Sequence, residues 1–369
     1  MFGFKIRIFQ PIVPEYRVAL FDGLADIYGE RIEVWAAERL GNDVSYPLAK
    51  MRYDYAHPLK KLGLFVWQKG LSLKGLRKGD VIVVCGDIHQ LSSLWIALKA
   101  RLKGVKVVWW GHHVSALSKK KNIYIRLFIA KRISDVYLCY TDAGIEYLEQ
   151  HGFLHGRVFA TGNTIDLVAV EKEKREWNGV RKFGDKKTLL FCGVLREKVR
   201  VDVLLRALVK LIERRNDFHC VIIGGGPMEG EWKKMSKNMG LASCVTWTGE
   251  LRGQDKLAPW FLSADLFVYP GRIGLSIVHA FAYALPVVLN GNKHNHGPEY
   301  VLFEPGINGY VFEEDNAEDM ANVIEQAVGD DARDQMGLCG QSIVFDNYTM
   351  KKMCSRFSDA IEAARNMVA

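Results

Sequence analysis

Short apolar runs recur along the 369-residue chain and alternate with longer stretches whose apolar positions follow helical spacing. Strands that alternate with helices are typical of βαβ units and of a parallel sheet covered on both faces. The pattern occurs twice, so the sequence predicts two such sheets. The first set of expected strands comprises Lys5–Phe9, Ile32–Ala36, Val81–Cys85, Val105–Trp110 and Val136–Cys139, with a helix over Leu91–Leu102. The second comprises Thr188–Cys192, His219–Ile223, Val245–Thr248, Leu266–Tyr269, Pro286–Asn290 and Gly309–Phe312, with helices over Val203–Arg214 and Gly230–Met239.

A highly charged stretch without a sustained apolar period separates the two sets. Such a composition is typical of an interdomain connection. We therefore expect an N-terminal α/β domain over residues 1–166, a linker over 167–187 and a second α/β domain over 188–346. Residues 347–369 are expected to form a C-terminal helix that packs back towards the first domain.

Composition places the chain among cytoplasmic globular proteins. Apolar residues make up 49% and charged residues 25%, which excludes a disordered or low-complexity protein. Seven scattered cysteines without C-x-x-C spacing favour inert buried thiols in a reducing compartment over zinc or disulfides. Lys5 and Arg7 interrupt the N-terminal apolar stretch, which we interpret as a strand and not as a signal peptide.

Basic residues are concentrated in the first half. Residues 1–166 hold 24 Lys and Arg against 15 Asp and Glu, whereas the remainder holds 26 against 27. Two segments, Lys60–Lys78 and Lys119–Arg132, mix cations with large apolar residues, which suits peripheral contact with an anionic membrane. A core-facing helix with a solvated basic side remains an alternative. Nucleic acid is not expected, because no RNA-binding signature accompanies these segments.

Glycine-rich motifs follow several strands of the second half. IIGGGPM runs from an expected strand through Gly225, Gly226 and Pro227 towards a helix. Glycine lets the backbone approach a ligand, and a helix N-terminus offers unpaired amides to an anion, although a plain tight turn is equally compatible. Downstream, ADLFVYPGRIGLSIVHAFAYALP places a strand, a Pro-Gly turn and a helix beginning near Gly274. HGPEYVLFEPGINGYVF then places His296 and Glu299 on a loop.

Together these motifs resemble the donor-binding domain of glycosyltransferase family 4, the "glycosyl transferases group 1". Further support comes from the strand ending at Gly193, the strand–loop–helix–strand unit Asp80–Val108 and TGNTID at Thr161–Asp166, which resembles the family's hinge signature. The resemblance implies α/β domains in the GT-B architecture, two Rossmann-like doubly wound parallel sheets facing across a cleft. It also implies a retaining glycosyltransferase that needs no metal ion, and the absence of a D-x-D motif agrees with this.

Several positions depart from the family pattern. The family's two glutamates, which meet the donor sugar and the ribose, correspond to Gly271 and His279. A neutral imidazole can still hydrogen-bond a ribose hydroxyl, so His279 is either a donor ligand or a packed histidine. The family's Arg–Lys pair is replaced by Val194 and a set of cations. The donor diphosphate is expected to meet Lys198 and Arg200, with Arg196 beside them, unless these residues form only a solvated helix start.

The resemblance also implies roles for other residues. It places Glu299 and His296 in the loop that meets the sugar and phosphates, and backbone amides of Gly274 and Leu275 at the diphosphate. Lys198, His112 and Glu299 are the candidate catalytic residues. His112 or its neighbour His113 is expected to point to the reacting sugar or the acceptor, and Arg17 to bind an acidic group of the acceptor. Each could instead serve a structural purpose at a loop or helix start.

We therefore expect transfer of a sugar from a nucleotide-diphosphate sugar to a saccharide or lipid-linked saccharide, in surface polysaccharide or glycan biosynthesis. The enzyme would act in the cytoplasm, with possible attachment to the inner face of the membrane and without a cofactor. Two alternatives stay open. The protein could be a nucleotide-sugar-binding protein that has lost catalysis, which would explain why Gly271 stands where the family has a glutamate. It could also be a nucleotide-sugar epimerase, which would use the same fold.

Overall fold

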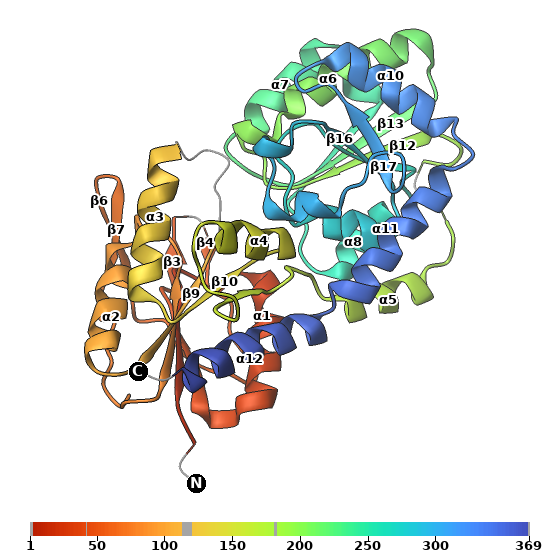
Figure 1. The fold of residues 1–369 in the computed structure, drawn as a ribbon. Coiled ribbons are helices and arrows are strands. Elements are labelled where there is room, and N and C mark those ends of the chain that lie inside the picture. Colours follow the sequence, from red (N-terminus) through yellow and green to blue (C-terminus); the bar gives the residue numbers. More distant parts are fainter. Residues whose placement is uncertain (1–2, 42, 113–119, 181–182, 368–369) are drawn as a thin grey trace. The chain divides into compact units, whose positions relative to one another are not determined.

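The computed structural model describes residues 3–41, 43–112, 120–180 and 183–367. The chain divides into two compact units (Figure 1). Unit 1 comprises Met1–Thr164 together with Met350–Ala369, and unit 2 comprises Ile165–Thr349. The segment predicted as a linker therefore belongs to unit 2, and it contains a regular helix, α5 (Leu167–Glu176). Asp166 caps this helix by accepting a hydrogen bond from the Ala169 amide, which explains why a charged sequence is helical here.

Unit 1 is built on a parallel sheet with the order β11-β10-β9-β8-β1-β2-β5. The expected strands are present within one or two residues. The strands are β1 (Ile6–Phe9), β2 (Ile32–Trp35), β5 (Arg52–Asp54), β8 (Val81–Cys85), β9 (Lys106–Trp110), β10 (Val136–Cys139) and β11 (Val158–Ala160). Two short antiparallel pairs lie outside this sheet: β3 (Arg39–Leu40) with β4 (Asp43–Val44), and β6 (Leu59–Leu62) with β7 (Phe65–Gln68). The helices are α1 (Glu15–Tyr28), α2 (Leu91–Leu102), α3 (Lys120–Ile133), α4 (Asp142–Gln150) and α12 (Met350–Asn366).

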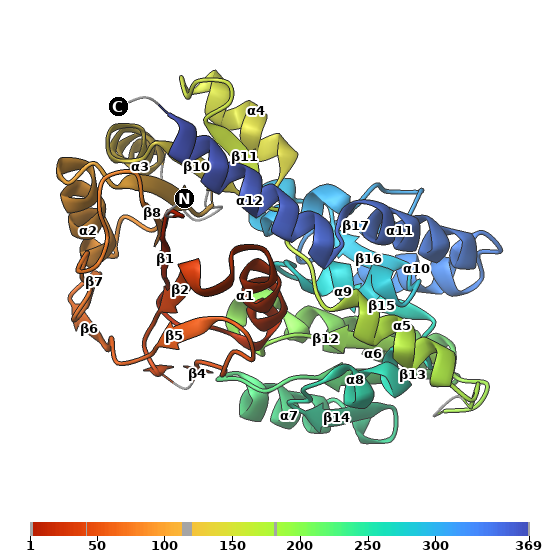
Figure 2. The same cartoon turned by 90° about the horizontal axis from the view of Figure 1, so that it is seen from below.

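Alternate residues of these strands enter two separate cores, one on each face of the sheet. Val81 and Val83 pack with α1 and α12, whereas Ile82 and Val84 pack with α2 and α3. Helix α12 lies against α1 and against strands β9 to β11 (Figure 2). The C-terminal helix is therefore part of unit 1, and it buries Phe357 and Ile361 completely.

Unit 2 has a parallel sheet of order β14-β13-β12-β15-β16-β17. Its strands are β12 (Lys187–Cys192), β13 (Phe218–Ile223), β14 (Val245–Gly249), β15 (Leu266–Tyr269), β16 (Val287–Asn290) and β17 (Gly309–Phe312). The helices around it are α5, α6 (Val201–Arg214), α7 (Glu229–Asn238), α8 (Gln254–Phe261), α9 (Ser276–Ala282), α10 (Ala317–Val328) and α11 (Arg333–Asn347). Strand β12 is buried over Thr188–Phe191 because α/β folds cover both faces of a parallel sheet.

The two basic segments form different elements. In residues 60–78, strands β6 and β7 make an antiparallel hairpin that turns at Gly63–Leu64. Gly63 has a φ of 62°, in the region that glycine adopts readily. The second basic segment does contain a helix, α3. None of the helices in the described parts of the chain is long and apolar enough to cross a membrane.

Candidate functional site: a switch point in each sheet

Each sheet reverses its strand order at one point, which is where open α/β sheets bind ligands. In unit 2 the chain runs from β12 outwards through β13 and β14, and then returns to β15 on the other side of β12. In unit 1 the corresponding neighbours are β1 and β8. The loops at the carboxyl ends of these strands are therefore the candidate sites.

Two glycine loops pack together at the switch point of unit 2. A side chain on Gly224 would place its Cβ 2.0 Å from the Gly193 carbonyl oxygen, and one on Gly226 would place it 2.5 Å from the Leu195 oxygen. The Leu195 amide donates to the Gly225 oxygen at 2.9 Å. Gly224 and Gly226 have φ values of 143° and 154°. The GGGP motif ending in Pro227 is thus a close backbone contact with the loop after β12, which only glycine permits.

Gly271 is packed against the loop that carries the predicted phosphate-binding cations. A Cβ at this position would lie 2.3 Å from the Lys198 carbonyl oxygen and 2.6 Å from the Val199 carbonyl carbon. The Gly271 amide donates to the Val199 oxygen at 3.1 Å, and the Arg272 amide donates to the Lys198 oxygen at 2.8 Å. A glutamate like that of the family therefore has no room here unless the Lys198–Val199 backbone moves.

Three cations gather around this contact. Arg196 and Lys198 come from the loop after β12, and Arg272 comes from the loop after β15. The pKa of Lys198 is lowered, first by partial desolvation and then by repulsion from Arg272 and Arg196. None of the three forms an ion pair within the described part of the chain. Clustered cations without a carboxylate are typical of a site for a polyanion such as a diphosphate.

Arg200 differs from these three cations. Its guanidinium pairs with Asp202, with Nε 3.1 Å from Oδ1, and with Asp315. Hydrogen bonds to these carboxylates raise the pKa of Arg200. Its backbone is left-handed, with a φ of 52°. These contacts give Arg200 a structural part in fixing the start of α6.

Sequence reasoning missed Arg272, although a cation directly after a strand-ending Pro-Gly turn was a visible signal.

Glu299 lies beside the loop that begins helix α9. It is 5% exposed and sits in the short 3₁₀ helix Pro298–Leu302. Its Oε2 is close to Gly274 and Gly297, because a Cβ on these glycines would approach it to 3.5 and 3.1 Å. Within the described residues, the backbone N–H groups of Gly274, Leu275 and Ser276 donate no hydrogen bond to the protein. The loop therefore presents a row of amide donors next to a buried carboxylate.

His296 holds this loop in place. Its Nδ1 accepts a hydrogen bond from the Ile273 amide at 3.3 Å, and its Nε2 donates to the Asn290 carbonyl oxygen at 3.0 Å. The ring stacks on Tyr300 with centroids 4.0 Å apart. Desolvation lowers the pKa of His296, which keeps the imidazole neutral. Because both ring nitrogens have partners within the protein, the geometry makes His296 a positioning residue.

Asn290 supports the same loop and was not predicted. It is fully buried at the end of β16, and its Nδ2 donates to the Pro270 oxygen at 2.8 Å and to the Gly271 oxygen at 3.3 Å. A polar residue that ends an otherwise apolar strand was the signal that could have found it.

His279 lies deeper, on α9. Its Nε2 is 2.9 Å from the Gln254 side-chain nitrogen, and Tyr283 donates to the same glutamine at 3.0 Å. The ring also contacts Phe261. Burial lowers the pKa of His279 to about 4, so it is neutral and accepts a hydrogen bond from Gln254. These contacts favour the packed-histidine alternative over a ribose ligand.

In unit 1, Arg17 lies at the corresponding edge. Its Nη1 donates to the Gln10 side chain, and its Nη2 donates to the Tyr140 hydroxyl at 3.2 Å. The guanidinium carbon lies 4.2 Å from the centroid of the Trp110 ring, while the buried Nε has no hydrogen-bond partner. No carboxylate pairs with Arg17 among the described residues. An uncompensated guanidinium held by neutral groups is suited to binding an anion.

His112 is exposed and follows strand β9. Its ring centroid is 4.6 Å from that of Tyr140, and its carbonyl oxygen accepts a hydrogen bond from Tyr137 at 2.8 Å. Tyr140 therefore links His112 with Arg17 at one sheet edge. Gly86 and Gly111 let the loops after β8 and β9 touch, since a Cβ on Gly111 would lie 2.8 Å from the Gly86 oxygen. His113 lies outside the described residues.

No cluster of three or more His, Cys, Asp or Glu side chains suited to a metal ion occurs in the parts of the chain that the structure describes. The charged groups at both edges are instead cations and one buried carboxylate. This arrangement can bind an anionic substrate.

The chain is similar to known glycosyltransferases. The family described as "Glycosyl transferases group 1" matches residues 186–330, which contain the whole cation and glycine cluster of unit 2. A GDP-mannose-dependent alpha-(1-6)-phosphatidylinositol monomannoside mannosyltransferase of Mycolicibacterium smegmatis is 26% identical over 191 residues, which cover 49% of each chain. The chain thus spans about half the length of this curated relative. An uncharacterized glycosyltransferase of Haemophilus influenzae is 24% identical over 80% of this chain and 76% of its own.

Solved structures share the complete fold. HepE of Anabaena, crystallised in complex with UDP, superposes with a TM-score of 0.70 at 14% identity, covering 98% of this chain and all of its own. A glycosyltransferase from Rickettsia africae gives a TM-score of 0.71 at 13% identity with both chains fully covered. The chain therefore has the GT-B fold, and its residues 186–330 are similar to the group 1 glycosyltransferases.

Proposed function

We propose that the protein is a retaining glycosyltransferase that moves a sugar from a nucleotide-diphosphate sugar to a saccharide or lipid-linked saccharide. The observation that carries this proposal is the cluster of Arg196, Lys198 and Arg272 beside the amide row Gly274–Ser276, without a carboxylate partner for any of the three cations among the described residues. Such a site is suited to the diphosphate of an activated sugar donor.

The proposed chemistry breaks the bond between the anomeric carbon and the diphosphate oxygen. Positive charge develops on the sugar and negative charge on the departing nucleoside diphosphate. The three cations and the amide row would stabilise the leaving diphosphate, since donors fixed in place act most strongly on charge that develops in the transition state. Glu299 and His112 would orient the sugar. The reaction would retain the anomeric configuration without a covalent carboxylate intermediate.

Unit 1 would bind the acceptor, with Arg17 holding an acidic group of it. The mycobacterial relative acts on a phosphatidylinositol mannoside, and a Salmonella typhimurium relative that is 25% identical over 48% of this chain is a lipopolysaccharide N-acetylglucosaminetransferase. Both names support a lipid-linked acceptor in surface polysaccharide or glycan biosynthesis. We place the reaction in the cytoplasm, at the inner face of the membrane.

We also propose that turnover needs neither a cofactor nor a metal ion. Activity that persists in excess chelator would support metal independence, and activity that disappears and returns with Mg²⁺ or Mn²⁺ would refute it.

The first experiment identifies the donor. Purified protein is incubated with UDP-, GDP-, ADP- and TDP-sugars, and thermal shift and nucleotide release are recorded, because a ligand that binds the native state raises its melting temperature. Lys198→Ala and Arg272→Ala should each lower kcat/KM by about 100-fold, or about 3 kcal/mol. Glu299→Gln should lower turnover while preserving the thermal shift. Lys237→Ala, which removes an exposed cation from α7, is the matched control.

Other outcomes identify other functions. A donor that binds but is never turned over with any acceptor extract would indicate a nucleotide-sugar-binding protein. An isomerised sugar formed without acceptor would indicate an epimerase. If no nucleotide sugar binds, the proposed function is wrong.

A further inference from the structure

A histidine–aspartate pair lies in the loop that follows β8 in unit 1. His89 Nδ1 is 2.9 Å from Asp87 Oδ1, and the His89 backbone N–H donates to the same oxygen at 2.9 Å. The two side chains are 53% and 58% exposed. Because a carboxylate only accepts hydrogen bonds, we assign the proton to Nδ1, and in the neutral ring Nε2 is then an acceptor. Within the described residues the ring makes no other hydrogen bond, so Nε2 can accept one from a ligand.

Backbone contacts hold the loop that carries this pair. The Val66 N–H of strand β7 donates to the His89 carbonyl oxygen at 2.8 Å, and the Gln90 N–H donates to the Asp87 carbonyl oxygen at 3.0 Å. The His89 ring is therefore positioned before a ligand arrives, which lowers the entropic cost of binding.

Buried glutamine side chains join the same loop to Arg17. Gln90 Nε2 donates to Gln68 Oε1 at 3.1 Å, and Gln68 Nε2 donates to the Gln10 carbonyl oxygen at 3.0 Å. The Gln10 side-chain oxygen in turn accepts a hydrogen bond from Arg17. The three glutamines are between 1% and 4% exposed. One buried network thus fixes both the loop and the guanidinium.

The charges of Asp87 and Arg17 act at one strand end, beside an aromatic ring. Burial raises the pKa of the Cys85 thiol to about 11, Asp87 raises it further and Arg17 lowers it. Phe65, at the start of β7, is 43% exposed, and its ring centroid is 6.2 Å from that of His89. This edge of the sheet therefore combines a cation, a hydrogen-bond acceptor and an apolar ring, which are the groups that orient small molecules in binding sites.

We propose that His89 accepts a hydrogen bond from a hydroxyl group of the acceptor saccharide. Asp87 is its positioning residue, and Phe65 packs against the C–H face of the sugar ring. A saccharide fits this chemistry because hydroxyl donors surround a ring with apolar faces. The inference rests on the proposed function and adds to it a subsite for the uncharged part of the acceptor, next to the acidic group that Arg17 would hold.

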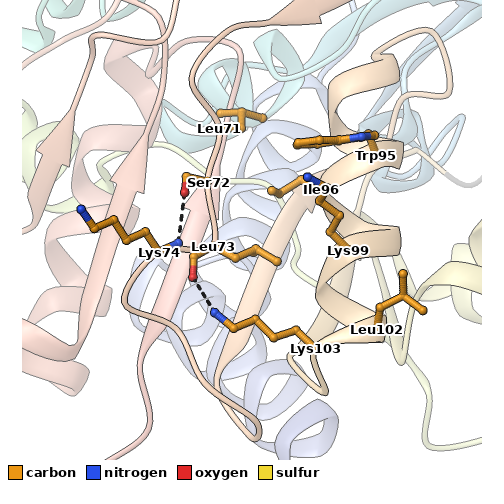
Figure 3. A pocket seen from close by; sticks show the side chains of 9 residues that line it. All are labelled: Leu71, Ser72, Leu73, Lys74, Trp95, Ile96, Lys99, Leu102 and Lys103. Atoms are coloured by element: carbon orange, nitrogen blue, oxygen red, sulfur yellow. Dashed lines mark hydrogen bonds between the residues drawn. The ribbon is translucent and has the colours of Figure 1, made fainter.

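A cavity elsewhere in unit 1 is less suited to the acceptor. It has a volume of about 520 Å³ and opens between α2 and the segment Leu71–Lys74 (Figure 3). Its ammonium groups already have partners, since Lys99 Nζ lies 3.6 Å from the Trp95 ring centroid and Lys103 donates to the Leu73 oxygen at 3.2 Å. Leu71–Lys74 precedes β8 and Lys103 follows α2, so these residues lie towards the amino edge of the sheet.

The first test observes the ring without any substrate. Nitrogen NMR of the full chain with isotopically labelled histidine should show His89 protonated at Nδ1 and unprotonated at Nε2, the signals being assigned by their loss in His89→Ala. Asp87→Ala should release this tautomer, so that both nitrogens share the proton. An unchanged tautomer in Asp87→Ala would overturn the positioning role of Asp87.

The second test uses methyl glycosides of glucose, galactose, mannose and N-acetylglucosamine as probes, without a donor. At least one glycoside should shift the His89 ring signals of the wild-type protein. Saturation-transfer NMR on the glycoside then measures affinity, which His89→Ala and Asp87→Ala should each lower by about tenfold. Phe65→Ser should lower it by about threefold. His89→Gln should recover part of the loss, because the amide oxygen also accepts hydrogen bonds.

His155 and Glu149 provide the matched control. His155 Nδ1 is 2.9 Å from Glu149 Oε1, the same contact, but His155 precedes β11 and so lies at the opposite edge of the sheet. His155→Ala and Glu149→Ala should bind the glycoside like the wild type. Thermal unfolding checks that every variant is folded.

Two results would overturn the proposal: no binding of any of the glycosides, or equal binding by the His89 and His155 variants. Because no donor is present, either result leaves donor turnover, and with it the proposed function, unaffected. Conversely, a glycoside site at His89 in a protein that turns over no donor would refute the proposed function alone.

Discussion

In both units the candidate site lies at the carboxyl edge of a parallel sheet, but the groups exposed there differ. In unit 2 the edge consists mainly of backbone, because Gly224, Gly226 and Gly271 bring loops together with no room for a Cβ. In unit 1 Gly86 and Gly111 also bring two loops together, but the charged group at the edge is a side chain, Arg17, held by Gln10, Tyr140 and Trp110. A backbone site fixes the position of amide donors, whereas a side-chain site can change its ligand through a single substitution.

This difference fits two kinds of substrate. A diphosphate is common to all nucleotide-sugar donors, and a rigid row of amides and cations can bind it regardless of the sugar. Acceptors vary, and a guanidinium supported by neutral side chains adapts more easily. We therefore expect changes in unit 2 to affect folding and donor binding together, and changes in unit 1 to affect acceptor binding alone.

The largest expected effect tests the backbone site directly. Gly271→Ala should lower the free energy of unfolding by about 3 kcal/mol, because its Cβ would lie 2.3 Å from the Lys198 oxygen and force the two loops apart. Displacement of the cation loop should weaken donor binding as well. Denaturant unfolding and donor titration measure the two effects.

Gly230 provides the control for this substitution. It lies in α7, and a Cβ there meets no atom within 4 Å. Gly230→Ala should leave stability unchanged or raise it by up to about 1 kcal/mol, since alanine favours a helix. If Gly271→Ala were equally harmless, the edge of unit 2 would not depend on its close backbone contacts, and the contrast with unit 1 would disappear.

A second effect concerns pH and also belongs to unit 2. Burial lowers the pKa values of His219 and His279 to about 4 from 6.5. As the pH falls, the unfolded chain therefore takes up protons that the native state does not. The free energy of unfolding is highest above pH 6.5 and falls as the pH drops towards 4. Between pH 7 and pH 5, each histidine should cost about 2 kcal/mol of unfolding free energy.

Hydrogen exchange at the two pH values can locate this loss. Peptides of unit 2 should lose protection at pH 5, and His279→Gln should reduce the pH dependence because glutamine does not titrate. A pH dependence that is unchanged in this variant would show that His279 is not neutral in the native protein.

Sequence alone predicted the strands of unit 2 and the central strands of unit 1, because a buried parallel strand needs a short apolar run and few other segments have one. It missed β5 and β11 at the two edges of the unit 1 sheet, each only three residues long. It located the glycine motif after β13, as a place where the backbone approaches a ligand or makes a tight turn, but it did not predict that these glycines and Gly271 bring two loops into contact. Residues 60–78 were not predicted as a hairpin, because a segment of cations interleaved with leucines is compatible with a β-hairpin and with an amphipathic helix.

The remaining site residues depended on contacts that sequence cannot show. Arg196, Lys198 and Arg200 look alike in the chain, yet only Arg200 meets Asp202 and a distant Asp315. The role of Arg272 depends on the packing of Gly271 against the Lys198 loop. Roles implied by the family for Glu299 and His112 stay predictions until substrates are tested.

The smallest effect tests the side-chain edge of unit 1. Once an acceptor is known, Arg17→Ala should raise its KM by about tenfold, or about 1.4 kcal/mol, because an anionic group loses its charged partner. The KM for the donor should not change. Tyr140→Phe removes one hydrogen bond to the guanidinium and should raise the acceptor KM less. Arg17→Lys should recover part of the loss, since it restores charge without the planar fork. Equal loss for Arg17→Lys and Arg17→Ala, accompanied by lower stability, would instead make Arg17 a structural residue and leave the acceptor anion to another group.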